Sequence, residues 1–377
     1  MDLRKPATVV QALFLAALLA VVGVMVVTAH DNLTRQNIAT GFGFLFDETG
    51  WDLGASLIQH SARDPYWRTF LVGLLNTLLL AFICIVLAAA LGVLVALVRT
   101  SGNPVMAGLS AFYINTCRNI PLLVQVFFWY HVTRYLPPVR QAISIGDVSF
   151  LSNRGLYVPS MSIDIGFIPV AIAALACAAI VPWFRAVNRT REKAGEPPYP
   201  LLFLLLAWLA VVAVIAAAMR PAIVISVPRL AGFNFQGGMA LSPEFTALVT
   251  AIVIYNAAFI AEIVRSGILS VPKGQIQAAR NIGLSPGVIY WKIVIPQAFR
   301  VAIPPLTNQS IFIAKESSLA VAIGYTDLFS VGTVAINHTG QSIEVIAVLM
   351  LVYLAISFGL SAVGNHLNRT ITRRWSR

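Results

Sequence analysis

The sequence has little charge. Of its 377 residues, 58% are hydrophobic and only 11% are charged, with a mean hydropathy of +0.81. Soluble globular domains carry about 25% charged residues. This composition therefore excludes an ordinary soluble protein and predicts an integral membrane protein.

Residues suited to metal, redox or phosphate chemistry are also scarce. The three cysteines (Cys84, Cys117, Cys177) each lie alone in an apolar stretch, which indicates core packing. The five histidines are scattered, so we predict no metal site. No Gly-Lys dipeptide occurs, which excludes a GxxxxGK[ST] phosphate loop. A membrane enzyme is a weak alternative because no nucleophile and base occur together.

Long apolar runs are what the chain has in abundance. A helix needs about 20 apolar residues to cross about 30 Å of hydrocarbon. The sequence predicts about eight such spans, at 9–29, 70–98, 107–133, 166–184, 201–219, 244–266, 298–323 and 343–367. The first follows Arg4 and Lys5, as a signal peptide would, but its apolar run exceeds a typical h-region. We therefore predict an uncleaved helix.

The net charge of +11 has two interpretations, nucleic-acid binding or membrane orientation. With the N-terminus in the cytoplasm, 16 of the 26 Lys and Arg residues fall in cytoplasmic loops or at the adjoining helix ends. The positive-inside rule explains this asymmetry. We predict a multi-pass protein with both termini cytoplasmic and no nucleic-acid partner.

A polar and amphipathic stretch, "GQIQAARNIGLSPGVIYWKIVIP", interrupts the apolar runs at 274–296. Pro272 and Gly283 are expected to begin and end one short helix, and Ser285-Pro286 to begin another. Pro296 is expected to end the second. The predicted apolar stripes are Ile276, Ala279 and Ile282 on the first helix and Val288, Trp291 and Ile295 on the second. Amphipathicity alone would also allow both helices to lie on the bilayer surface.

The spacing within this stretch is specific. Gln277-Ala278-Ala279 is followed after three residues by Gly283, after nine more by Ile293, and then by Ile295-Pro296. This resembles the EAA loop of ABC importer permeases, with Gln277 in place of the usual Glu and Ile295 in place of Leu. The resemblance implies a coupling helix that docks on an ATPase. The residues expected to carry the coupling are Gln277, Ala278, Ala279, Gly283, Ile293 and Pro296.

Other stretches resemble amino-acid permeases, and the chain looks most like the larger permease subunits of general L-amino-acid and glutamate/glutamine/aspartate/asparagine transporters. They are "GLLNTLLLAF" (73–82), "RNIPLLVQVFFWY" (118–130), "AEIVRSGILSVPKGQ" (261–275) and "KESSLAVAIGYTDL" (315–328). The implied fold is an all-α type I importer (MetI-like). Its core would be five helices starting near 70, 107, 244, 298 and 343, with three peripheral helices near 9, 166 and 201.

The resemblance also implies partners and a location. We expect a bacterial inner-membrane subunit in contact with lipid, paired with a second homologous permease as a heterodimer. Two ATP-binding subunits and a periplasmic amino-acid-binding protein complete the complex. No cofactor is expected in this chain, because the partner ATPase would bind ATP and Mg.

The predicted domain organisation follows the spans. Residues 1–69 would form an N-terminal transmembrane helix and a periplasmic loop, and residues 70–367 the permease domain. Within the latter, inserted helices occupy about 134–243 and the cytoplasmic coupling loop 267–297. Residues 368–377 would be a cytoplasmic basic tail.

Polar groups at membrane depth are the candidates for a translocation path. On the span at 298–323, Asn308 and Gln309 lie on the same side of the helix as Lys315 and Glu316, within a sector about 100° wide. These side chains either line the path or form a structural Lys-Glu or interhelical pair. The candidate path residues are Arg118, Gln125, Asn308, Lys315 and Glu316. Arg118 would either bind a substrate carboxylate or extend its guanidinium to the cytoplasmic membrane–water interface.

Two further expectations concern charged groups near the inner membrane surface. Glu262 is expected to pair with Arg265, three residues later on the same helix. The alternative function is a secondary transporter driven by protons or sodium through Lys315, Glu316 and Glu262. Uptake that survives loss of an ATPase would identify that alternative.

Overall fold

A computed structural model describes residues 6–35, 40–54, 56–163, 184, 186–188, 190–191 and 223–375. The chain divides into two compact units. The first joins Met1–Tyr135 to Ser242–Arg377, and the second is Leu136–Leu241.

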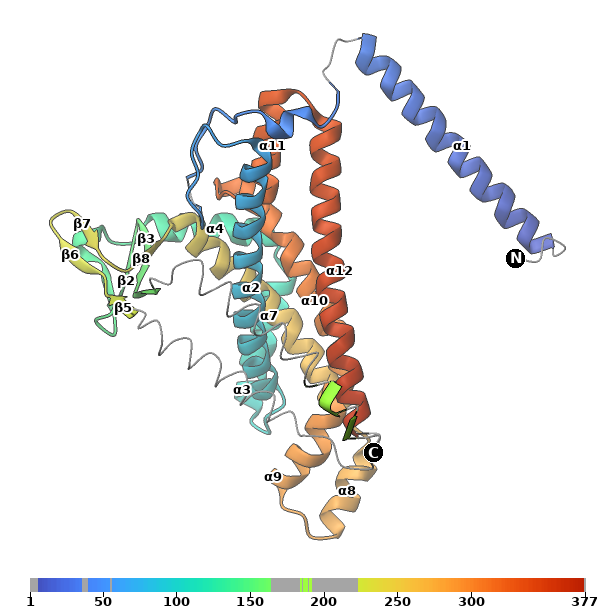
Figure 1. The fold of residues 1–377 in the computed structure, drawn as a ribbon. Helices are drawn as coiled ribbons and strands as arrows, with labels where there is room; N and C mark the ends of the chain where they lie inside the picture. The colour runs from blue at the N-terminus through green and yellow to red at the C-terminus, as the bar shows by residue number, and fades with distance from the viewer. Residues whose placement is uncertain are drawn as a thin grey trace. The chain divides into compact units, whose positions relative to one another are not determined.

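The first unit is helical (Figure 1). Its α-helices are α1 (Pro6–Arg35), α2 (Tyr66–Arg99), α3 (Pro104–Asn119), α4 (Leu122–Arg134), α7 (Pro243–Leu269), α8 (Lys273–Asn281), α9 (Pro286–Ile289), α10 (Ile295–Glu316), α11 (Leu328–Thr339) and α12 (Ser342–Trp375). Three shorter turns are 3-10 or π helices: η1 (Gly43–Phe46), η3 (Tyr290–Val294) and η4 (Ser317–Ile323).

Three described helices are long and apolar enough to cross a membrane: Tyr66–Arg99, Pro243–Leu269 and Ser342–Ile371. A fourth span results if Pro286–Ile323 and Leu328–Thr339, bent by 50°, cross together. The spans predicted at 166–184 and 201–219 lie almost entirely outside the described residues. The total of eight therefore stays a prediction.

The predicted single span at 107–133 is wrong, because it is two helices, α3 and α4. The break falls at Ile120-Pro121, where Ile120 is extended, with φ −96° and ψ 123°. A proline disfavours helical backbone in the residue before it and cannot donate an amide hydrogen bond. The Gln125 side chain occupies this break: its Nε2 donates to the carbonyls of Cys117 at 2.9 Å and Ile120 at 3.1 Å.

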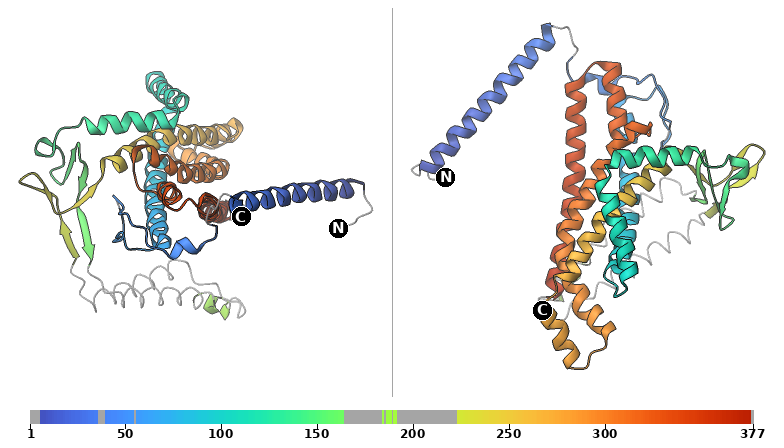
Figure 2. Two further views of the ribbon diagram at one scale, coloured as in Figure 1. Left: turned by 90° about the horizontal axis from the view of Figure 1, so that it is seen from above. Right: turned by 180° about the vertical axis from the view of Figure 1, so that it is seen from behind.

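Close helix packing organises the first unit. Helix α2 packs along α7, and α7 and α12 both pack against α10 (Figure 1 and Figure 2). A Cβ atom added at Gly92 of α2 would lie 2.6 Å from Ile260 Cγ2 of α7. Glycine therefore sets the separation of these two helices, as small residues commonly do in membrane bundles.

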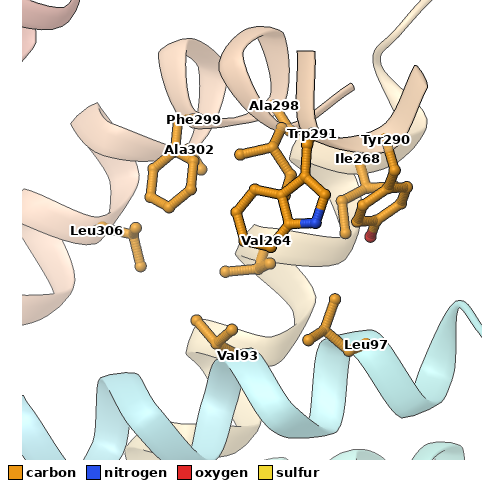
Figure 3. Close-up of a pocket in the computed structure, with 11 residues that line it drawn as sticks. Val93, Leu97, Val264, Ile268, Tyr290, Trp291, Ala298, Phe299, Ala302 and Leu306 are labelled. Atoms are coloured by element: carbon orange, nitrogen blue, oxygen red, sulfur yellow. The ribbon is translucent and has the colours of Figure 1, made fainter. Parts of the chain in front are cut away.

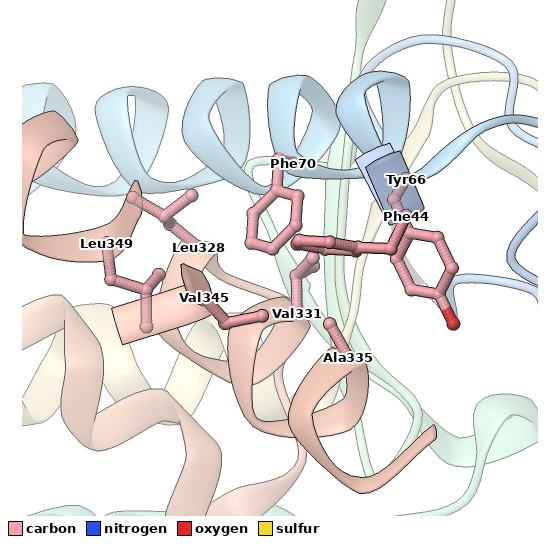
Figure 4. Close-up of a cluster of buried hydrophobic side chains, with 8 residues drawn as sticks. All are labelled: Phe44, Tyr66, Phe70, Leu328, Val331, Ala335, Val345 and Leu349. Carbon is pink, nitrogen blue, oxygen red and sulfur yellow. The ribbon is translucent and has the colours of Figure 1, made fainter. Parts of the chain in front are cut away.

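An apolar cluster joins α2, α11 and α12 at one end of the first unit. Figure 4 shows the Phe70 ring between side chains of α11 and α12. Eight buried residues make up the cluster: Phe44, Tyr66, Phe70, Leu328, Val331, Ala335, Val345 and Leu349. Their burial fixes the bent segment α11 against the two long helices.

The second unit corrects the all-α expectation, because its described residues at 143–163 and 223–241 include eight short strands, while residues 184, 186–188 and 190–191 are helical. The strands are β1 (Ile143–Ile145), β2 (Ser149–Ser152), β3 (Gly155–Val158), β4 (Ser160–Ile163), β5 (Ile223–Ser226), β6 (Arg229–Ala231), β7 (Asn234–Gln236) and β8 (Met239–Leu241), with one 3-10 turn, η2 (Val139–Gln141). The antiparallel sheet has the order β1-β2-β3-β8, and β4-β5 and β6-β7 are two-stranded antiparallel pairs. Gly146 and Asp147 both have positive φ, which favours the tight turn between β1 and β2.

Candidate functional site

Helices α8 and α9 form a helical hairpin that extends past the ends of α7 and α10 (Figure 1). We call residues 272–296 the projecting loop. Gly283 has φ +80°; its amide donates to Arg280 O, and the Leu284 amide donates to Ala279 O. These two bonds form a Schellman motif. Ser285 and Pro286 then begin α9, so the predicted end and restart of the helix are both confirmed.

An apolar cluster holds the projecting loop together. Val271, Ala279, Ile289 and Val294 are buried in it, with Ile276 packed against them. The predicted placement of Ile276 and Ala279 on the packed face is confirmed. The placement of Ile282 and Trp291 there is wrong, because these side chains are 75% and 71% exposed.

The opposite side of α8 is exposed. Gln277 and Ala278 both lie on this exposed surface, and Arg280 and Asn281 extend it. A Cβ atom at Gly283 would meet no atom within 4 Å. The loop therefore presents Gln277 and Ala278 on an exposed helix surface, while the other side of the helix packs within the loop.

Pro296 does not end the second helix, contrary to prediction. The chain passes from α9 through the π turn η3 into α10, and Pro296 is buried in the first turn of α10. A proline is tolerated there because the first amides of a helix have no carbonyl partner within it. The π turn also explains the exposure of Trp291, since it changes the face that each later residue presents.

Trp291 borders an apolar groove of about 450 Å³ (Figure 3). The indole points towards Val264 of α7, and Leu97 of α2 forms another wall (Figure 3). Phe299 and Leu306 continue the groove along α10. The groove links the base of the projecting loop to three long helices.

A buried polar network joins α7 to α10. The Asn256 side chain is fully buried, and its Nδ2 donates to Glu316 Oε2 at 2.6 Å and to Ile252 O at 2.9 Å. Its Oδ1 accepts from Gln309 Nε2 at 2.6 Å. Sequence patterns do not single out Asn256 as a functional residue. The available signal is a single amide in the apolar run "IVIYNAAFIAEI".

Two candidate path residues of α10, Asn308 and Lys315, lie outside this network. Asn308 and Lys315 are exposed, while Glu316 is half-buried. Among the described residues, the ion pairs do not include one between Lys315 and Glu316. The structure thus brings Glu316 and Gln309 together through Asn256 and leaves Asn308 and Lys315 on an open surface.

The remaining two candidate path residues, Arg118 and Gln125, lie in different environments. Gln125 is buried at the α3–α4 break, whereas Arg118 is exposed with its guanidinium carbon 5.1 Å from the Phe259 ring centroid. Close by on α7, both carboxylate oxygens of Glu262 accept hydrogen bonds from Arg265, with Oε2 2.9 Å from Nε. The predicted pair within one helix is therefore confirmed. Within the described ranges, no group of His, Cys, Asp and Glu could hold a metal ion.

Comparison with known proteins gives a consistent assignment. The family described as "Binding-protein-dependent transport system inner membrane component" matches residues 195–377. The chain is 45% identical over 369 residues to the putative amino-acid ABC transporter permease protein YhdX of Escherichia coli, covering 96% of this chain and 93% of the relative.

Two further relatives match over most of their length. The general L-amino acid transport system permease protein AapQ of Rhizobium johnstonii is 40% identical, with 90% of this chain and 86% of the relative covered. The glutamate/glutamine/aspartate/asparagine transport system permease protein BztB of Rhodobacter capsulatus is 32% identical, with 96% and 92% covered. The chain belongs to the inner-membrane permease subunits of amino-acid ABC importers, which are transport proteins without an ATPase domain.

Proposed function

We propose that this permease translocates polar amino acids across the bacterial inner membrane by alternating access, driven by a separate ATPase. Its relatives AapQ and BztB are named for general L-amino acids and for glutamate, glutamine, aspartate and asparagine. The observation that carries the proposal is the exposed Gln277-Ala278 surface on the projecting loop. Ala278 leaves room for close approach, and the Gln277 amide can donate and accept hydrogen bonds, so this surface can dock on a partner protein.

The six coupling residues divide into two roles. Gln277 and Ala278 would contact the ATPase directly, because both are exposed. Ala279, Gly283, Ile293 and Pro296 would fix the shape of the loop, since Ala279 and Pro296 are buried and Gly283 has a positive φ. A rigid loop can then transmit the movement of the ATPase into α7 and α10.

The complex that we propose has two permeases, two ATP-binding subunits and a periplasmic amino-acid-binding protein. This chain would pair with a homologous permease as a heterodimer. Both termini and the projecting loop would lie in the cytoplasm, on the side where the basic residues concentrate. ATP and Mg would bind to the ATPase subunits.

The path would run past the exposed Arg118 and along the exposed side of α10 that carries Asn308 and Lys315, with the half-buried Glu316 at its border. Arg118, Asn308 and Lys315 are exposed in the single chain. Polar side chains are unfavourable against lipid, so their exposure supports an aqueous path beside them. Gln125 would not line the path, since its amide already satisfies two backbone carbonyls at the α3–α4 break.

The test is Gly283→Val, with Gly102→Val as the matched control. A β-branched residue is strained at φ +80°, so the end of α8 should change, whereas Gly102 has an ordinary φ and open space around it. We expect Gly283→Val to insert normally and lose ATP-driven uptake, and Gly102→Val to retain it. Normal uptake by Gly283→Val would contradict the coupling role.

Purification of the intact complex from native membranes tests the partners. Mass spectrometry through a tag on this subunit should reveal a second permease and an ATPase pair. Recovery of this chain alone, still active in uptake driven by an ion gradient, would replace the proposal with a secondary transporter.

A further inference from the structure

An apolar groove of about 390 Å³ runs along the line where α10 and α12 pack together. Its walls include Ile303 and Ser310 of α10, Leu360 and Leu367 of α12, and Ile85 of α2. The Ser310 hydroxyl donates to a carbonyl of its own helix at 2.9 Å, so its proton is already used. The groove therefore suits hydrocarbon better than a polar ligand.

The dimensions of the groove match one extended chain. It follows α10 from Phe299 to Ser310 and α12 from Leu360 to Ile371, which is about 16 Å along each helix. This length corresponds to one leaflet, half of a hydrocarbon core about 30 Å thick. A volume of about 390 Å³ over that length gives a mean cross-section of about 24 Å², whereas a helix with its side chains is about 10–12 Å wide. A lipid acyl chain fits this space, and a further helix does not.

The groove lies on the side of α10 away from the proposed path. Asn308 follows Ile303 by five residues, which places it about 140° around the helix, and it is exposed there together with Lys315. On α12, the groove is bordered by Val363 and Leu367, whose apolar side chains are 59% and 51% exposed. If the polar side of α10 faces the path, this apolar side faces lipid.

An arginine marks one end of the groove. A Cβ atom at Gly364 of α12 would overlap the Thr307 side chain of α10, so the two helices touch at this point. They run in opposite directions (Figure 1). Arg300, seven residues before Thr307, and Ile371, seven residues after Gly364, therefore lie at the same end. Arg300 is exposed, and the ion pairs among the described residues do not include it, so its guanidinium can bind an external anion.

We propose that this groove binds one acyl chain of an anionic phospholipid from the cytoplasmic leaflet, with the lipid phosphate held by Arg300. Lipid tails are as apolar as the groove, so the chain alone gives no preference for one phospholipid over another. Arg300 supplies the selectivity, because a guanidinium forms paired hydrogen bonds with a phosphate and attracts a headgroup of net negative charge. The leaflet follows from the proposed orientation of the chain, and the site does not depend on the transported substrate.

The experiment locates the lipid in the intact complex. The complex is purified in mild detergent and mixed with phosphatidylglycerol that carries a diazirine in one acyl chain. After illumination, mass spectrometry maps the cross-linked peptides, and unlabelled phosphatidylglycerol and phosphatidylcholine compete for labelling. We expect labelling at 299–310 and 360–371, with phosphatidylglycerol the stronger competitor. Equal competition by the two lipids would overturn the assignment of an anionic headgroup.

Arg300→Gln tests the headgroup contact. We expect half-maximal labelling to need about fivefold more probe, the usual scale for one basic residue at an anionic membrane surface. The preference for phosphatidylglycerol over phosphatidylcholine should fall as well. Arg369→Gln is the matched control, since Arg369 is exposed but lies two residues before Ile371 and so on the other side of α12. Equal effects of the two variants, or none, would contradict the role of Arg300.

Val363→Trp tests the groove itself, because the larger side chain would fill the space between the helices. Labelling should be lost, whereas Leu354→Trp, at an exposed position of α12 outside the groove, should leave it unchanged. Labelling that survives Val363→Trp would place the lipid elsewhere. Cross-linking of Leu367→benzoylphenylalanine to another protein segment instead of lipid would make the groove a protein interface. Wild-type uptake that needs no ATPase would refute the proposed function and leave the lipid site standing.

Discussion

Two polar stripes on α10 begin one residue apart and have different environments. Gln309 and Glu316 face α7, where Asn256 bonds to both of them. Asn308 and Lys315 lie on the exposed surface. A helix turns by about 100° per residue, so a single step separates a side chain that joins two helices from one that faces an open surface.

Polar residues in a membrane bundle therefore divide by what they contact. Sequence periodicity alone places all four in one sector, which leaves the path and the structural pair as open alternatives. Burial and hydrogen bonding assign the first stripe to interhelical contact. The second stripe, without such contacts to α7, is the better candidate for a path.

The largest expected effect comes from breaking the partnered stripe. Asn256→Leu keeps the approximate side-chain size but removes hydrogen bonds from the Glu316 carboxylate and the Gln309 amide. We expect the free energy of unfolding to fall by about 3 kcal/mol, because hydrogen bonds to charged groups contribute strongly. Tryptophan fluorescence during denaturation of the detergent-purified protein measures the change.

The control for Asn256→Leu is Asn308→Leu, an identical replacement on the exposed stripe. Its effect on stability should stay within about 0.5 kcal/mol. Equal losses from the two variants would remove the distinction between the stripes. Adding Glu316→Leu and Gln309→Leu to Asn256→Leu should restore part of the stability, since replacing all partners leaves fewer unpaired polar groups.

An intermediate effect is expected from Glu316→Ala. Asn256 would keep its bonds to Ile252 and Gln309, so the loss of stability should be about 1.5 kcal/mol. Glu316 also borders the open surface, and we expect substrate-stimulated ATP turnover of the reconstituted complex to fall. A change in assembly alone, with normal turnover per complex, would limit Glu316 to its interhelical contact with Asn256.

The smallest change in stability should follow Lys315→Gln. Lys315 is exposed, so the free energy of unfolding should change by no more than about 0.5 kcal/mol. Substrate-stimulated ATP turnover should nevertheless fall, with Lys315→Arg retaining more activity than Lys315→Gln. A marked loss of stability with unchanged turnover would move Lys315 to the partnered stripe.

Local sequence signals predicted the projecting loop well. Gly283, Ser285 and Pro286 each favour one backbone geometry, and that geometry depends little on the rest of the chain. The exposed Trp291 could not be predicted in this way. The predicted stripe assumed the residue spacing of a regular α-helix. In the structure, Ile289 lies directly before the π turn and Val294 is its last residue. These two residues, five positions apart, pack in the same cluster.

Two other differences between the predictions and the structure had a signal in the sequence. The hydrophobicity of the neighbouring residues favoured a membrane helix more strongly than these signals opposed it. Ile120-Pro121 is an unfavourable pair within a helix, and Gly146-Asp147 favours a hairpin turn. The Asn256 network had a weaker signal. A lone Asn in an apolar run indicates a polar contact, but only the packing of α7 on α10 determines that its partners are Gln309 and Glu316.

The π turn η3 connects the exposed part of the projecting loop to α10 and ends two residues before Pro296. A π turn holds one residue more than an α turn. Conversion to α geometry would therefore rotate α9 about the axis of α10 by about 100° and shift it by about 1.5 Å. Such a register change would convert a displacement of the loop into a rotation relative to α10, the helix that carries the polar stripes.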